Sequence, residues 1–308
     1  MLATHFPGIG TIVLDRNYGF TGGYNRAMAR LLSGPGPRPE YLLLLNSDIL
    51  VEPGWLDRLT DYMDTHPECG VCGPKLLALT HKDGAYIQTD RLEYAGAAGG
   101  YIDRFGYPFC RGRVLSRTDV DGPGYSSVKD VLWVSGACLM TRASLWEESG
   151  GLDERFFAHM EEIDYCWRAQ LAGHRVRVVP SSRVWHLGGG TLPRTSATKL
   201  RLNYRNGLLL LDNNLAPTIG RFKARVRIIT RLVLDDCSAL VYLLVGKTDF
   251  CGSVFRAHRE YRRLRKVPHK AASRNGDVRG VAPVCIILQS LLRGERIFDY
   301  LRRYEDSH

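Results

Sequence analysis

The sequence of 308 residues predicts an α/β fold in which helices flank a mixed, mostly parallel sheet. Residues 41–45 form a continuous apolar run, as expected of a central strand that is covered on both faces. Residues 175–180 alternate between basic and apolar side chains, as a half-buried strand does. Ile163, Cys166 and Leu171 recur at helical spacing, which predicts a helix with one buried face between these strands. Strands that alternate with amphipathic helices are typical of the α/β class.

The first predicted unit is a strand, a glycine-rich turn and a helix. Residues 11–15 are rich in apolar and β-branched side chains and predict the strand. In the turn at 17–25, Gly22 and Gly23 permit close backbone approach, and Asn25 follows them. Backbone amides in such a turn can hold a phosphate or a base. The spacing differs from the dinucleotide fingerprint, so by itself this signal is weak.

A polar triplet, Asn46, Ser47 and Asp48, follows the apolar run at 41–45. Ligands of α/β sheets bind beyond the carboxyl ends of the strands. A carboxylate at Asp48 beside the amide of Asn46 can hold a divalent cation, Mg²⁺ or Mn²⁺, which in turn holds a diphosphate. A polar turn before the next helix explains the same residues without a ligand, because Pro53 suits the start of that helix.

The middle of the chain has a less regular pattern. Residues 69–79 predict a strand, and residues 80–128 predict irregular structure with short strands. Two further short strands are expected in residues 131–140. They meet at Gly136, where a bend or a close backbone approach is implied.

An acidic helix is expected from about residue 159 to residue 172. Asp164 lies four residues before Arg168, so the two can form an ion pair along the helix surface. Glu162 borders the apolar stripe without such a partner, and its pKa can be tuned for general base catalysis. Glu161 is expected to point further from that stripe. A solvated acidic first turn, favoured by the helix dipole, is the alternative.

His186 ends the strand pattern that begins at residue 175, and three glycines follow it at 188–190. This placement lets the imidazole reach a ligand, although a lone histidine is more often structural. The remaining expected elements are a helix at 196–214, basic helices at 216–266, a polar linker at 268–280 and a last amphipathic helix at 281–303.

The net charge of +10 is unevenly distributed. Residues 1–215 hold 23 basic and 23 acidic side chains, whereas residues 216–308 hold 19 basic and 9 acidic ones. We therefore expect an α/β domain at 1–215 and a basic helical region at 216–308 that can contact an anionic membrane surface. Nucleic acid is not an expected partner, because aromatic side chains do not interleave with these charges as a stacking platform requires.

The eight cysteines lack the density of a disulfide framework, which favours a reduced, cytoplasmic setting. Cys69 and Cys72 have redox spacing, but they lie in an apolar strand pattern and no second pair completes a zinc site. The first residues lack the pattern of a signal peptide. The apolar stretches near the C-terminus are too short or too charged to cross a bilayer.

Five segments together resemble the family 2 glycosyltransferases of the GT-A fold, in particular the bacterial rhamnosyltransferase-like branch. In order they read NYGFTGGYNRAM, LLLLNSDILVEPGWL, VSGACLMTR, GGLDERFFAHMEEIDYCWRAQLAGHRV and VWHLGGGT. The resemblance covers about residues 11–215. It implies a GT-A catalytic domain that moves a sugar from a nucleotide-diphosphate sugar to a lipid-linked or cell-surface glycan, in the cytoplasm with contact to the inner face of the cytoplasmic membrane.

The resemblance also implies residue roles. Asp48 stands at the DXD-like position as the metal-binding carboxylate, and His186 matches the late histidine that approaches the metal and the diphosphate. Glu161 and Glu162 fall on the acidic motif whose second member deprotonates the acceptor hydroxyl in an inverting single displacement. The candidate substrate-binding residues are Gly22, Gly23, Asn25, Asn46, Trp133, Gly136 and Ala137.

Two departures from the family pattern bear on these roles. The second acid of the motif is Glu162 where the family has aspartate, so the choice between Glu161 and Glu162 stays open. Family members also begin with a strand, a helix and a strand that carry the aspartate contacting the nucleotide base, and we expect this chain to begin after them.

Two other functions fit parts of the sequence. A sugar nucleotidyltransferase also places a metal-binding acid near a parallel strand, but its N-terminal glycine-rich loop with a catalytic basic residue is missing here. A non-catalytic sugar-binding or nucleotide-binding remnant is the second alternative.

Overall fold

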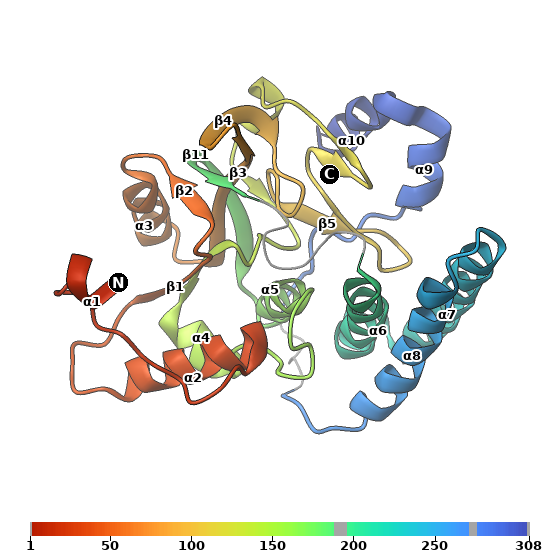
Figure 1. Cartoon of the computed structure of the whole chain (residues 1–308), viewed down its shortest axis with the longest axis horizontal. Coiled ribbons are helices and arrows are strands. Elements are labelled where there is room, and N and C mark those ends of the chain that lie inside the picture. The colour runs from red at the N-terminus through yellow and green to blue at the C-terminus, as the bar shows by residue number, and fades with distance from the viewer. Residues whose placement is uncertain (1, 188–195, 271–275, 307–308) are drawn as a thin grey trace.

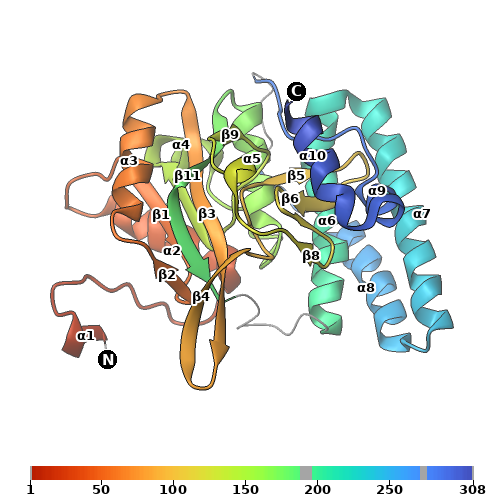
Figure 2. The ribbon, with the colours of Figure 1, turned by 90° about the horizontal axis from the view of Figure 1, so that it is seen from above.

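The computed structural model describes residues 2–187, 196–270 and 276–306, so the glycines at 188–190 lie outside the described residues. Within them, seven strands form one sheet, in the order β1, β10, β3, β11, β2, with β4 beside β3 and β9 beside β11 (Figures 1 and 2). The strands are β1 Tyr41–Leu45, β2 Ile49–Val51, β3 Cys69–Lys82, β4 Ala85–Leu92, β9 Lys129–Asp130, β10 Cys138–Arg142 and β11 Arg175–His186.

The pairing in this sheet is mixed. β3 and β11 run parallel at its centre, whereas β10 pairs antiparallel with both β1 and β3, and β2 pairs antiparallel with β11. The α/β class is therefore confirmed. β1 was expected to be a central strand but lies at an edge of the sheet. Its side chains are nevertheless packed on both faces: Leu42 and Leu44 belong to the main core cluster, and Leu43 packs against two smaller apolar clusters. This two-sided packing explains the unbroken apolar run.

A second, smaller sheet lies within the segment for which short strands were expected. Its order is β5, β6, β7, β8. The bounds are Gly100–Ile102, Pro108–Cys110, Arg113–Val114 and Arg117–Thr118, followed by a 3-10 turn at Pro123–Tyr125.

Helices cover both faces of the large sheet. On one face, α3 (Trp55–Thr65) packs Leu59 and Met63 against sheet residues. On the other, α5 (Glu161–Leu171) buries the predicted stripe of Ile163, Cys166, Trp167 and Leu171 in the main core cluster. The helices α2 (Gly19–Ser33) and α4 (Ala143–Ser149) add Met28 and Trp146 to that cluster.

Three helices, α6 (Ala197–Ile219), α7 (Arg221–Leu244) and α8 (Thr248–Leu264), lie side by side, and α6 also contacts α5 (Figure 1). The expected domain boundary between 215 and 216 falls inside α6. The last segment returns to the small sheet, where Ile102 bridges Val281 and Arg111 pairs with Glu305. The remaining elements are α1 Leu2–His5, α9 Ile286–Arg293, a 3-10 turn at Gly294–Arg296 and α10 Ile297–Asp306. None of the helices in the described ranges combines the length and apolar character needed to cross a membrane.

Two expected strands are wrong. Residues 11–15 pair with no described strand, so no neighbouring strand forms hydrogen bonds with their backbone groups. The side chain of Val13 is 81% exposed. Residues 131–137 make only an isolated bridge between Trp133 and Gly100 before β10 begins at Cys138.

All eight cysteines are free, and five of them are buried in the two sheets and α5. Burial raises the thiol pKa of each of the five: Cys69, Cys72, Cys110, Cys138 and Cys166. The interpretation of Cys69 and Cys72 as residues of a core strand is confirmed.

Candidate active site

Asp48 and His186 meet because β2 pairs with the end of β11. Ile49 lies opposite His186 in this pair, so the residue before Ile49 comes next to the imidazole. Nε2 of His186 is 3.4 Å from Oδ1 of Asp48, and the amide of Leu187 donates to the Asp48 carbonyl at 3.1 Å. The structure thus brings together the two residues predicted to share a metal.

A second carboxylate, Glu93, faces the other side of the imidazole. Its Oε1 lies 3.5 Å from Nδ1 of His186, and the residue is 2% exposed. Burial lowers the pKa of His186, but hydrogen bonding and the negative charges of Glu93 and Asp48 outweigh this and raise the pKa above its ordinary value. Sequence analysis missed Glu93, because it lies in the segment without a clear period.

The pair of Asp48 and His186 suits a divalent cation. Among the residues with described positions, no group of three or more His, Cys, Asp or Glu side chains could hold a metal by itself. Two protein ligands still fit Mg²⁺ or Mn²⁺, since Mg²⁺ is commonly bound by one or two carboxylates together with substrate phosphates and water. Glu93 would fix the orientation of the imidazole, as carboxylates behind metal-bound histidines do. A cation held there would neutralise charge on a leaving diphosphate.

The turn before β10 connects this pair to the acidic helix. The amide of Asn46 donates to the carbonyl of Ala137 at 2.9 Å. A Cβ atom on Gly136 would lie 3.4 Å from Cβ of Glu162 and 3.5 Å from the ring of Phe20. Asn46, Gly136 and Ala137 are therefore brought together, between Asp48 on one side and Glu162 on the other.

Glu161 and Glu162 begin α5, and each keeps one buried carboxylate oxygen without a hydrogen-bond partner among the described residues. Burial, and then the charge of Glu162, raise the pKa of Glu161 well above its ordinary value. Burial raises the pKa of Glu162 from 4.5 to about 7, although backbone hydrogen bonds oppose this. The expectation that Glu161 points away from the core is wrong: it is 5% exposed and more buried than Glu162, because α5 is enclosed on nearly all sides.

The loop that enters α5 has an unusual backbone. Phe157, His159 and Met160 have φ values of 63°, 72° and 70°, which side chains other than glycine seldom adopt. Each costs roughly 1–2 kcal/mol, and such backbone is retained where the surrounding structure imposes it, often at functional sites. The amides of Phe20 and Thr21 hold the loop by donating to the carbonyl of Phe157 at 2.9 and 3.3 Å.

The predicted glycine-rich turn is instead the first part of a helix. α2 begins at Gly19, so Gly22 and Gly23 lie within it, and two of its first amides are used by the loop before α5. Asn25 donates to the carbonyl of Leu152 at 2.8 Å and accepts from the Leu152 amide at 2.9 Å. Its side chain thus holds a neighbouring loop.

Trp133 lies in the core. It is 3% exposed, and its indole N–H donates to the carbonyl of Tyr101 at 3.1 Å. A Cβ atom on Gly100 would collide with the indole ring, so glycine at position 100 is what admits it. This placement speaks against direct contact of Trp133 with a substrate.

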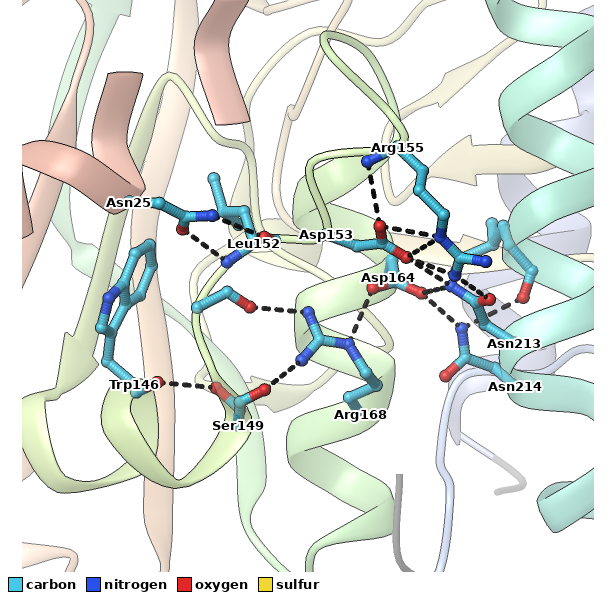
Figure 3. A network of polar contacts seen from close by, with 12 residues as sticks. Asn25, Trp146, Ser149, Leu152, Asp153, Arg155, Asp164, Arg168, Asn213 and Asn214 are labelled. Carbon is cyan, nitrogen blue, oxygen red and sulfur yellow. Dashed lines mark hydrogen bonds and ion pairs between the residues drawn. The ribbon is translucent and has the colours of Figure 1, made fainter. Parts of the chain in front are cut away.

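The third acid of α5 has a full set of partners (Figure 3). Oδ2 of Asp164 accepts from Arg168 at 2.7 Å, as predicted, and Oδ1 accepts from Asn213 and Asn214 at 2.8 and 2.9 Å. Arg168 also donates to the carbonyls of Ser149 and Gly151. A cavity of about 330 Å³ next to this network is lined by Arg168 but by none of the predicted metal or catalytic residues. We therefore assign the network a structural role.

A sequence model of the family described as "Glycosyltransferase like family 2" matches residues 2–207. Over 211 residues the chain is 28% identical to the N-acetylglucosaminyl-diphospho-decaprenol L-rhamnosyltransferase of Mycobacterium tuberculosis, covering 67% of each protein. Over 186 residues it is 26% identical to the rhamnosyltransferase WbbL of Escherichia coli, covering 60% of this chain and 66% of that protein. An O-antigen biosynthesis protein, RfbC of Myxococcus xanthus, is 31% identical over 150 residues, which are 48% of this chain and 11% of that protein.

Proposed function

The chain belongs to the family 2 glycosyltransferases, and from this premise we propose that it transfers a sugar from a nucleotide-diphosphate sugar in one inverting displacement. The acceptor oxygen forms a bond to the anomeric carbon, the bond from that carbon to the diphosphate oxygen breaks, and the acceptor proton passes to a base. One observation carries the proposal: the turn at 135–137 contacts Glu162 on one side and the segment that carries Asp48 on the other. Asp48 in turn lies next to His186, so the proposed metal ligands and the proposed base lie at the same turn.

Glu162 is the base in this proposal. Its pKa of about 7 leaves a substantial fraction ionised near neutral pH, yet gives the carboxylate more affinity for a proton than an exposed glutamate has. Asp48 and His186 would hold Mg²⁺ or Mn²⁺ at the diphosphate. Burial and the charge of Glu162 raise the pKa of Glu161 well above its ordinary value, which favours the protonated form of Glu161 and limits the repulsion between the two acids.

The donor and the acceptor follow from the relatives. Two of them are named as rhamnosyltransferases, and the one from Mycobacterium tuberculosis is named for a diphosphate-linked polyprenol carrying N-acetylglucosamine. We extend this to the chain: the donor is a nucleotide-diphosphate rhamnose, and the acceptor is an N-acetylglucosaminyl-diphospho-polyprenol.

A lipid-linked acceptor requires contact with a membrane, and α7 offers a surface for it. Phe222, Val226, Ile229 and Val233 are exposed at helical spacing along one side of α7. Basic side chains at Arg221, Lys223 and Arg225 accompany them. Apolar residues flanked by cations suit the headgroup region of an anionic bilayer. In this arrangement the enzyme is a peripheral protein of the inner face of the cytoplasmic membrane.

Calorimetry tests the metal and donor site. Nucleotide-diphosphate rhamnose should bind more tightly with Mg²⁺ or Mn²⁺ than with EDTA, and Asp48→Ala should remove this difference while the fold survives. Asp57→Ala, which removes an exposed carboxylate in the first turn of α3, serves as the control. Metal-dependent binding that persists in Asp48→Ala would move the site elsewhere.

Vesicle co-sedimentation tests the membrane surface. The chain of 308 residues should bind anionic vesicles less well at high salt, since salt screens charge attraction. Ile229→Glu should weaken binding, whereas Ile87→Glu, an equally apolar exposed change on β4, should not. Equal binding by both variants would exclude α7 as the contact.

A further inference from the structure

A buried side chain from the C-terminal helices holds the loop that leads into the acidic pair. Asn206 of α6 is fully buried and directs its amide nitrogen at three carbonyl oxygens. The distances are 3.1 Å to Phe156, 2.8 Å to Ala158 and 2.7 Å to His159. Its own oxygen accepts from Nε of Arg205 at 2.8 Å. The side-chain nitrogen of Asn206 therefore holds the loop, and its side-chain oxygen holds Arg205.

Arg205 extends the contact to a more distant helix. Its Nη2 donates to the carbonyl of Phe156 at 2.7 Å, and its Nη1 lies 3.4 Å from Glu260 of α8. Glu260 also pairs with Arg201 at 2.5 Å. A continuous line of polar contacts thus runs from α8 through α6 to the loop before Glu161.

The loop determines how α5 begins. The carbonyl of Met160, the last of its residues with positive φ, accepts from the amide of Asp164 at 3.0 Å and so forms the first turn of the helix. If the donors of Asn206 were removed, the carbonyls of Ala158 and His159 would lose their side-chain partner in a partly buried place. Buried carbonyls without partners are costly, so the loop would turn them towards water and would move Glu161 and Glu162 with it.

We infer that Asn206 is a positioning residue for the acidic pair: it holds the loop at 156–160, with its left-handed residues Phe157, His159 and Met160, and thereby keeps Glu162 in place at the turn 135–137. This rests on the proposed role of Glu162 as the base. Within α5, the titratable groups that interact with Glu162 are Glu161 and the thiol of Cys166. At the loop, the titratable groups are His159 and, from α6, Lys199 and Arg205.

The test compares two buried asparagines of the same helix. Asn206→Ala removes the donors to the loop. Asn214→Ala is the matched control, because Asn214 is also fully buried and donates to Asp164 and to a carbonyl of its own helix. Asn206→Ser, a milder change, is made in parallel in case Asn206→Ala does not fold.

The first measurement follows the carboxyl carbons of Glu161 and Glu162 by NMR as a function of pH, assigned with Glu161→Gln and Glu162→Gln. Both asparagine variants should lose thermal stability. Only the Asn206 variants should bring the titration of Glu162 down from about 7 towards its ordinary range, by about one pH unit or more, because the carboxylate gains water. An unchanged titration in Asn206→Ala or Asn206→Ser would overturn the inference and leave Asn206 a purely structural residue.

The second measurement is turnover with nucleotide-diphosphate rhamnose and N-acetylglucosaminyl-diphospho-polyprenol. The Asn206 variants should lose at least about tenfold in kcat with donor KM nearly unchanged, whereas Asn214→Ala should keep kcat. Loss of donor affinity in place of kcat would contradict a role through Glu162. Absence of transfer by the wild-type protein would count against the proposed function alone, since the NMR titration decides the inference without it.

Discussion

The carboxylates in the first turns of α5 lie in two opposite environments. Asp164 is fully buried, yet both of its oxygens accept hydrogen bonds, from an arginine and two asparagines. Glu161 and Glu162, two or three residues earlier, each keep a buried oxygen without a described partner. Each of the three acids has at least one buried carboxylate oxygen, and the supply of donors separates them.

This difference teaches which buried acid serves stability and which is free for chemistry. A carboxylate with paired donors stays charged and fixes its neighbours. A carboxylate that keeps one buried oxygen without a donor holds its proton more strongly and can exchange it near neutral pH. The same helix therefore anchors the fold with one acid and carries a candidate base with another.

The largest expected effect comes from removing the paired acid. Asp164→Ala would leave Arg168 buried without its carboxylate, and the free energy of unfolding should fall by about 3–5 kcal/mol. Denaturant unfolding measures it. Glu154→Ala, which breaks an exposed pair with Arg26, is the control and should cost less than about 1 kcal/mol. Equal losses would mean that burial does not distinguish the two pairs.

The next effect concerns the unpaired acids and is kinetic. Glu162→Gln should leave donor binding nearly intact and lower turnover by about a hundredfold or more, the usual scale for loss of a general base. Glu161→Gln should cost less. Donor affinity is measured separately on folded protein. Should Glu161→Gln lose turnover while Glu162→Gln retains it, the role of base passes to Glu161.

The smallest effect is on stability as a function of pH. Because the pKa of Glu162 is raised from 4.5 to about 7 in the folded state, its protonated form favours folding. That contribution is complete below pH 4.5 and is lost as the pH rises through about 7. Thermal unfolding of Glu162→Gln should depend less on pH across this window than unfolding of the wild type. Parallel curves would show that Glu162 is solvated.

Sequence reasoning placed the groups that depend on strand ends. Asp48 and His186 were expected at the ends of two strand patterns, and the pairing of β2 with β11 brings them within 3.4 Å. Glu93 could not be predicted, because the segment that forms β4 and the small sheet has no regular hydrophobic period. Asp164 and Arg168 were expected to pair, since their spacing of four residues alone brings them together.

The parts that could not be predicted depend on tertiary contacts. No glycine marks the left-handed backbone of Phe157, His159 and Met160, which contacts from α2 and α6 impose on ordinary residues. The burial of Glu161 depends on neighbours that enclose α5 on several sides, whereas helical periodicity assumes one buried face. The segment 17–25 was expected to be a turn but is largely helical. The amide of Phe20 in this first turn of the helix donates to the carbonyl of Phe157, which lies 137 residues later in the chain.

The reactivity of the buried cysteines reports local unfolding of the protein. A thiol reacts as the thiolate, so the five buried cysteines with raised pKa values should react with an alkylating reagent only after local unfolding, whereas the exposed Cys237 should react at once. Cys110 belongs to the small sheet and Cys138 to the large one. Mass spectrometry of partly alkylated protein would therefore report whether the small sheet opens before the large sheet, without any introduced label.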